Sequence, residues 1–228
     1  MVFVFLSTVN EKARLSSSKQ SFMNRDRKRS NDQQACYFIT FNVVDWVDIF
    51  VRPAYKKVIA QSLNEYIESK GLVVYAWCLM SNHLHLVAQA KPGFSFAVII
   101  RQLKKRMAQR VMEVMKDEPD LRKEWMLGRF ENFSQCLKRI EKHPLWQDCN
   151  HPVHIESDDR ALLLQHIRYV HENPVRDGIV ESPEDYLYSS ARDYAAMKGM
   201  VHIRKVAPLP GDAMPLVSSR FLHPENMN

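Results

Sequence analysis

The stretch Val74-Tyr-Ala-Trp-Cys-Leu-Met-Ser-Asn-His-Leu-His-Leu86 predicts a β-hairpin near the middle of the chain. We expect an apolar strand, a two-residue turn at Ser81-Asn82, and a second strand that begins with His83 and His85. Side chains alternate between the two faces of a strand, so both imidazoles project the same way, about 7 Å apart at the backbone. Two rings at that separation can converge on one metal ion.

The segments around this hairpin predict an α+β domain. Residues 37–44 are aromatic and β-branched, as is typical of a strand, and residues 153–155 are expected to form a short last strand. Apolar residues at helical spacing predict four helices, over residues 53–70, 94–115, 121–140 and 158–173. We expect the third helix to be interrupted at Gly128 and the fourth to have Ser157 as its N-cap. This order of elements indicates a small antiparallel sheet with helices packed on one face.

Composition narrows the class of protein. The 228 residues are 46% hydrophobic, which is enough for one well-buried core, and the net charge of +6 favours a polyanionic partner such as nucleic acid. No apolar run approaches the roughly 18 residues that span a membrane, so no membrane partner is expected. The cysteines have no paired spacing, which favours reduced thiols in a cytoplasmic protein; they are Cys36, Cys78, Cys136 and Cys149.

Three regions divide the chain. Residues 1–34 are rich in Ser, Asn, Gln, Lys and Arg and predict a flexible basic leader. Residues 35–196 hold all the elements above and are expected to form the functional domain, followed by a C-terminal tail over residues 197–228.

The last predicted helix carries the second group of candidate residues. Tyr169 and Asn173 are four residues apart and therefore share one helix face. Pro174 disfavours helical geometry in the residue before it, so we expect Asn173 at the helix end. An ion bound by His83, His85 and Asn173 would keep open positions for a phosphate oxygen, and the Tyr169 hydroxyl would lie near the same phosphorus.

These residue types fit phosphodiester chemistry. A cation neutralises the charge that builds up in the transition state, and a tyrosine nucleophile stores the bond energy in a covalent phosphotyrosine. Imidazole suits Zn or Mn whereas an amide oxygen suits Mg or Mn, so the residues alone leave the metal open.

Each signal also has a structural explanation. A His-x-His strand often packs or faces solvent, a helical tyrosine usually belongs to the core, and Asn before Pro is a common helix stop. Basic residues of the helix over 94–115 could contact DNA phosphates or form a solvated surface; they are Arg101, Lys104, Lys105, Arg106 and Arg110. Arg168 and Arg176 are further candidates for a flanking phosphate, and a solvent-exposed role is equally open to them.

The motifs together resemble a known family. Residues 75–86 are similar to the signature of the HUH single-tyrosine transposases, in which two histidines flank a hydrophobic residue. Tyr169-Val-His-Glu-Asn-Pro-Val-Arg-Asp-Gly-Ile-Val180 resembles the catalytic helix of the branch of REP-associated tyrosine transposases (IS200-like domain). Residues 146–152 and 186–192 also resemble segments of that branch, and the likeness runs from about residue 36 to 195.

The resemblance implies a ferredoxin-like (RRM-like) fold. It implies that Tyr169 is the nucleophile that forms a 5′-phosphotyrosine, and that His83, His85 and Asn173 bind a divalent metal, Mg or Mn. The implied substrate is single-stranded or hairpin DNA, including repetitive extragenic palindromes, and no nucleotide cofactor is needed. The implied assembly is a monomer or a homodimer.

Two other functions are also compatible with these residues. A metal hydrolase with water as nucleophile would leave Tyr169 in a structural role. A non-catalytic DNA-binding module, derived from a transposase, would need neither the metal nor the tyrosine.

Overall fold

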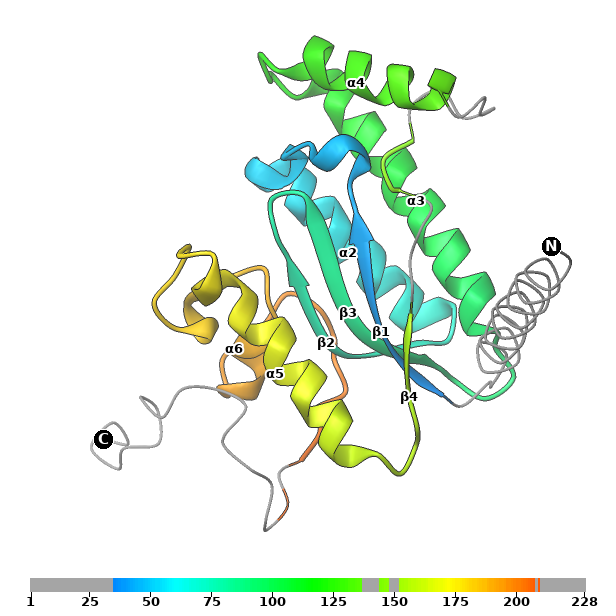
Figure 1. The fold of residues 1–228 in the computed structure, drawn as a ribbon, viewed down its shortest axis with the longest axis vertical. Coiled ribbons are helices and arrows are strands. Elements are labelled where there is room, and N and C mark those ends of the chain that lie inside the picture. The colour runs from blue at the N-terminus through cyan, green and yellow to red at the C-terminus, as the bar shows by residue number, and fades with distance from the viewer. Residues whose placement is uncertain (1–34, 137–143, 148–151, 208, 210–228) are drawn as a thin grey trace, which may run out of the picture.

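Four antiparallel strands form the single sheet of the part of the chain that the computed structural model describes, namely residues 35–136, 144–147, 152–207 and 209 (Figure 1). The strands lie in the order β2-β3-β1-β4 and are β1 (Cys36–Asn42), β2 (Leu72–Leu79), β3 (His83–Ala90) and β4 (Val153–Ile155). This order is that of a ferredoxin-like fold, in which two helices connect the strand pairs. The predicted fold class is therefore confirmed.

Helices connect and follow these strands. The α-helices are α2 (Pro53–Ser69), α3 (Phe96–Asp117), α4 (Lys123–Cys136), α5 (Arg160–Arg176) and α6 (Ala191–Tyr194). Three short 3₁₀ turns are η1 (Val44–Trp46), η2 (Ile49–Val51) and η3 (Pro183–Asp185). None of the helices that the structure describes combines the length and the apolar character needed to cross a bilayer.

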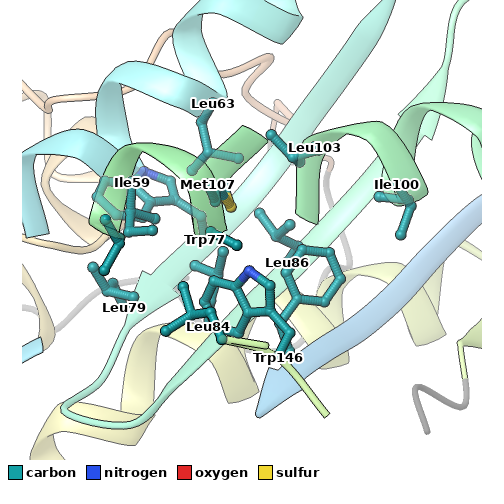
Figure 2. Packing of buried hydrophobic residues seen from close by; sticks show 14 of the residues in the cluster. Ile59, Leu63, Trp77, Leu79, Leu84, Leu86, Ile100, Leu103, Met107 and Trp146 are labelled. Carbon is teal, nitrogen blue, oxygen red and sulfur yellow. The ribbon is translucent and has the colours of Figure 1, made fainter. Parts of the chain in front are cut away.

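The sheet separates two hydrophobic clusters. Leu84, Leu86 and Trp77 point to the face that α2 and α3 cover, where they pack with Leu63 and Met107 of these helices (Figure 2). All five side chains are fully buried, so this cluster is the main core.

The opposite face of the sheet is covered by α5. Ile167 and Val170 of this helix pack on Cys78 and Val87 of the sheet, and Figure 1 shows α5 crossing the face that α2 and α3 do not touch. The sequence prediction placed the helices on one face, and this detail is wrong for α5. The reason is that β2 and β3 are apolar on both faces, so two layers of helix can bury them.

Three predicted helix boundaries also differ. Helix α4 continues through Gly128 without a break, because one glycine weakens a helix by only about 1 kcal/mol. Helix α5 begins after Asp159, not Ser157, since the Asp159 carboxylate accepts a bond from the Leu162 N–H. The same helix passes through Pro174 and ends at Arg176, one turn later than predicted.

The free edge of β2 is covered by the segment after α5. The Ser190 N–H donates to the Trp77 carbonyl and the Leu79 N–H donates to the Tyr188 carbonyl. Further along, the Arg204 N–H donates to the carbonyl of Val74, so the chain still lies against the sheet beyond residue 196. These bonds satisfy backbone groups that an edge strand otherwise exposes. The predicted leader, residues 1–34, and residues 210–228 of the tail lie outside the described residues.

Candidate metal and tyrosine site

The histidine pair lies at the start of β3, on the face that α5 covers. The centroids of the His83 and His85 rings are 4.6 Å apart and the rings meet edge to face. The register pairs His83 with Asn42 and His85 with Thr40 on β1. The prediction that both rings project to one side, close to one another, is confirmed.

His85 is the more buried of the two, with 5% of its surface exposed. Its Nδ1 lies 2.8 Å from the Thr40 hydroxyl oxygen, whereas its Nε2 is buried without a partner that has hydrogen-bond geometry among the described residues. Burial, with a smaller contribution from the neighbouring His83, lowers the pKa of His85 to about 3, and the Asn173 side chain opposes both effects. The ring is therefore neutral near pH 7, and Nε2 offers a lone pair that no described hydrogen bond uses.

His83 is half-buried, and the neighbouring Asn82 side chain orients it. Its Nδ1 lies 2.7 Å from the Asn82 amide oxygen, which leaves Nε2 as the nitrogen available to a ligand. Burial lowers the pKa of His83 too, although the Asp177 carboxylate raises it in part. Both histidines thus have one ring nitrogen held by a polar neighbour, which is the usual arrangement of imidazole ligands in metal sites.

Tyr169 reaches the histidines from α5. Its ring centroid lies 5.6 Å from that of His85, with the rings edge to face. The Arg176 guanidinium carbon lies 5.3 Å from the Tyr169 ring centroid. This cation stands beside the phenol, where it can offset negative charge on a phosphate or on a phenolate oxygen.

Asn173 lies on the next turn of α5, with 9% of its surface exposed. Its side-chain N–H donates to the Tyr169 carbonyl, 2.7 Å away, so its amide oxygen is left as the atom that can bind a cation. The side chain also raises the pKa of His85, which places it beside that ring. Asn173 thus lies beside the histidine pair, and its role with His83 and His85 as a metal ligand stays a prediction.

A divalent cation fits this donor set. Among the described residues, no group of three or more His, Cys, Asp and Glu side chains is placed to hold a metal ion. A site here therefore depends on an amide oxygen as third ligand beside two imidazoles. Nε2 of His85, next to the Asn173 amide, is buried without a hydrogen-bond partner among the described residues, and an ion bound there would explain this.

Sequence reasoning missed an aromatic residue at the centre of the site. The Phe38 ring on β1 stacks on His85 and on His166, with centroid distances of 5.8 Å and 4.7 Å, and meets Tyr169 edge to face at 5.6 Å. Phe38 pairs with Val87 in the sheet, so it points to the same face as His85. The strand alternation predicts that face, but only the register of β1 against β3 places Phe38 beside the histidines.

The sequence also missed the residues that hold α5 on the sheet. His171 is fully buried, and its Nε2 lies 2.9 Å from the Ser190 hydroxyl oxygen. The same hydroxyl oxygen accepts a bond from the Trp77 N–H on β2. This connection fixes α5, two residues after Tyr169, to the edge strand.

The basic residues predicted to contact DNA are in two places. Those of α3 belong to the opposite layer of the sheet from Tyr169 (Figure 1). Two of them bind the Glu65 carboxylate: Arg106 Nε at 3.5 Å and an Arg110 terminal nitrogen at 2.8 Å. Arg101 and Lys105 are exposed.

The remaining candidates are Lys104, which also lies on α3, and the two arginines of α5. The Lys104 ammonium donates to the Gln147 carbonyl, 2.7 Å away. Arg168 is half-buried on α5, and Arg176 forms an ion pair of 2.6 Å with Glu172. Among these cations, Arg176 contacts the Tyr169 ring.

A family model described as "Transposase IS200 like" matches residues 34–131. A solved structure described as a REP-associated tyrosine transposase bound to a REP hairpin is similar over 81% of this chain and 94% of its own, with a TM-score of 0.51 and 14% identity. A crystal structure of a Deinococcus radiodurans R1 protein is similar over 60% of this chain and 90% of its own, with a TM-score of 0.37 and 17% identity. No curated protein matches the chain.

Proposed function

We propose that this chain is a member of the IS200-like transposase family, whose model matches residues 34–131, and that it cleaves and rejoins single-stranded DNA through Tyr169. In this proposal His83, His85 and Asn173 hold a divalent metal, Mg or Mn. The observation that carries this proposal is that three kinds of side chain meet at one place. Two adjacent imidazoles come from β3, and α5 supplies a phenol, whose ring lies 5.6 Å from His85, and an amide one turn further along.

The protein groups have distinct roles in the reaction. When bound, the metal supplies positive charge that stabilises the pentavalent phosphate in the transition state. The Thr40 and Asn82 side chains hold Nδ1 of the two imidazoles, so Nε2 of each would be the nitrogen that binds the ion. Arg176, beside the Tyr169 ring, binds the phosphate or the departing strand through its guanidinium.

Tyr169 carries out the covalent step. Its hydroxyl oxygen forms a bond to phosphorus while the bond between phosphorus and the 3′ oxygen breaks, and the phenolic proton is transferred overall to that oxygen. The products are a 5′-phosphotyrosine and a free 3′-hydroxyl. A 3′-hydroxyl can later attack the phosphotyrosine, which restores a phosphodiester and the phenol without an external energy source.

We further propose that the substrate is a hairpin with single-stranded flanks. Support comes from the fold shared with the solved structure that is described as holding a REP hairpin. The net charge of +6 also favours a polyanion. Binding should then weaken with salt, because each phosphate contact releases counterions.

The test is a denaturing gel of the full chain with a 3′-labelled hairpin strand drawn from sequence that flanks its gene. We expect a protein–DNA adduct that requires Mg or Mn and disappears with EDTA. The label must be at the 3′ end because the proposed linkage keeps the downstream fragment on Tyr169. The Tyr169→Phe variant should form no adduct and release no cleaved strand.

A second tyrosine provides the matched control. Tyr188 packs under the Lys56 ammonium, 4.7 Å from the ring centroid, and Tyr188→Phe keeps that ring. This variant should form the adduct as the unchanged protein does. Metal-dependent cleavage without an adduct, unaffected by Tyr169→Phe, would assign the site to a hydrolase that uses water. Binding without any cleavage would instead identify a DNA-binding module.

A further inference from the structure

Trp46 is exposed at the end of the sheet that carries the histidine pair. It retains 57% of its surface, whereas Trp77 and Trp146 retain 0% and 5%. We propose that its indole is a stacking platform for an unpaired base of the nucleic acid strand that enters the histidine–tyrosine site. This proposal deepens the function above, because it assigns a subsite for single-stranded DNA, and it rests on that function for the identity of the strand.

A short chain of hydrogen bonds connects Trp46 to the site. The Asn82 side-chain N–H donates to the Trp46 carbonyl, 3.3 Å away, and the Asn82 amide oxygen lies 2.7 Å from Nδ1 of His83. One side chain therefore touches both the Trp46 backbone and the first proposed metal ligand. A strand whose phosphate lies at His83 has its neighbouring nucleotides within reach of this loop.

The backbone around Trp46 is held in an uncommon conformation. Asp45 and Trp46 have φ values of 56° and 55°, in the left-handed region that a bulky side chain rarely adopts. Two contacts keep the loop there: Asp45 pairs with Arg129 at 2.7 Å, and the Trp46 N–H donates to the Val43 carbonyl. Burial in the core does not explain the strain, because more than half of the Trp46 surface stays exposed. Strain of this kind is concentrated at functional positions.

The surroundings favour a nucleic acid over a protein partner. A second exposed tryptophan, Trp125 on α4, retains 54% of its surface, and the Arg129 guanidinium carbon lies 6.0 Å from its ring centroid. Arg129 thus connects Trp125 on α4 to the Trp46 loop through Asp45. The nearby Asp45 is paired with that arginine, and the Asp48 carboxylate accepts a bond from the Ser81 hydroxyl. Two exposed indoles near the proposed phosphodiester site suit a single strand, because unpaired bases stack on aromatic rings.

The test measures binding, not cleavage. Full-length protein in EDTA is titrated into fluorescein-labelled oligothymidine, because stacking accepts any base. Trp46→Ala should weaken binding about tenfold, whereas Trp46→Phe should lose a smaller part of the affinity. Val51, on the adjacent turn, is exposed to nearly the same degree at 56%, so Val51→Ala is the matched control and should bind as the unchanged protein does.

A second strand separates stacking from phosphate contacts. An oligonucleotide with abasic sites keeps the phosphates and lacks the bases, so the unchanged protein and Trp46→Ala should bind it equally. In a Trp125→Phe background, Trp46 is the one exposed tryptophan of the chain, and oligothymidine should protect its fluorescence from acrylamide. Equal binding of oligothymidine by Trp46→Ala and the unchanged protein, or an equal loss on the abasic strand, would overturn the proposal. Because no step requires an adduct, a failure of tyrosine cleavage would leave this result standing by itself.

Discussion

The Nε2 atom of His171 lies 2.9 Å from the Ser190 hydroxyl oxygen, which is bonded in turn to the Trp77 N–H on β2. His171 and Ser190 are both fully buried. Since Tyr169 stands two residues before His171, this connection determines where the phenol lies above the sheet. It makes the position of the proposed nucleophile depend on a segment twenty residues further along the chain.

Replacing Ser190 with alanine should therefore loosen α5. The change leaves the buried His171 nitrogen and the Trp77 N–H without this partner, so we expect the free energy of unfolding to fall by about 1–3 kcal/mol. Urea denaturation measures the loss. Ser62→Ala is the control, because Ser62 is equally buried but bonds only within its own helix, to the Val58 carbonyl, apart from a long contact of 3.4 Å with Arg110. A loss no larger than that of Ser62→Ala would show that the connection does not hold the helix.

Thr40 should control metal affinity through His85. Its hydroxyl is the group that holds Nδ1 of His85, 2.8 Å away, and valine has nearly the same shape without the oxygen. We expect Thr40→Val to weaken Mn²⁺ binding by about 10–100-fold, as is typical when the partner of an imidazole ligand is removed. Calorimetric titration with Mn²⁺ provides the measurement. Thr40→Ser, which restores a hydroxyl, should recover most of the affinity, and failure to recover it would contradict this role.

His85 should make the metal-free protein less stable in acid. Its pKa is about 3 when folded and 6.5 ordinarily, so between these values the unfolded chain binds a proton that the folded chain does not. The free energy of unfolding should therefore fall as the pH decreases from about 6.5 towards 3, by at most about 1.4 kcal/mol per pH unit from this group. Urea denaturation across this range, with EDTA present, should show a shallower decline for His85→Gln. Parallel curves for the two proteins would contradict the prediction.

The exposed cations of α3 should contribute to DNA binding through charge alone. No ion pair involves Arg101 or Lys105 within the described ranges, whereas Arg106 already binds Glu65. We expect Arg101→Ala and Lys105→Ala each to lower the slope of log Kd against log salt by about 0.7–0.9. Arg106→Ala should lower it less, because its charge is partly neutralised. Fluorescence anisotropy at several salt concentrations tests this, and unchanged slopes would exclude α3 as a DNA-docking face.

The sequence predicted most helices and strands, but only some of the contacts between them. The hairpin, the facing histidines and the short strand β4 followed from alternation and turn residues, which act over neighbouring positions. The end of α5 was wrong, because Pro174 was expected to stop a helix that in fact continues to Arg176. A proline disfavours helical geometry in the residue before it, but this local preference is weak. The packing of Ile167 and Val170 on the sheet can outweigh it.

The sequence by itself determined that His83 and His85 share a face and that Tyr169 and Asn173 share a helix side. Both results follow from the fixed periods of strand and helix, which every chain obeys locally. Only the tertiary structure decided that these two faces meet, that Phe38 and Thr40 from β1 stand beside the histidines, and that Trp46 remains exposed next to them. These contacts join segments that are tens of residues apart in the sequence. They depend on the register of the strands and on the packing of the whole domain, which a local sequence pattern does not specify.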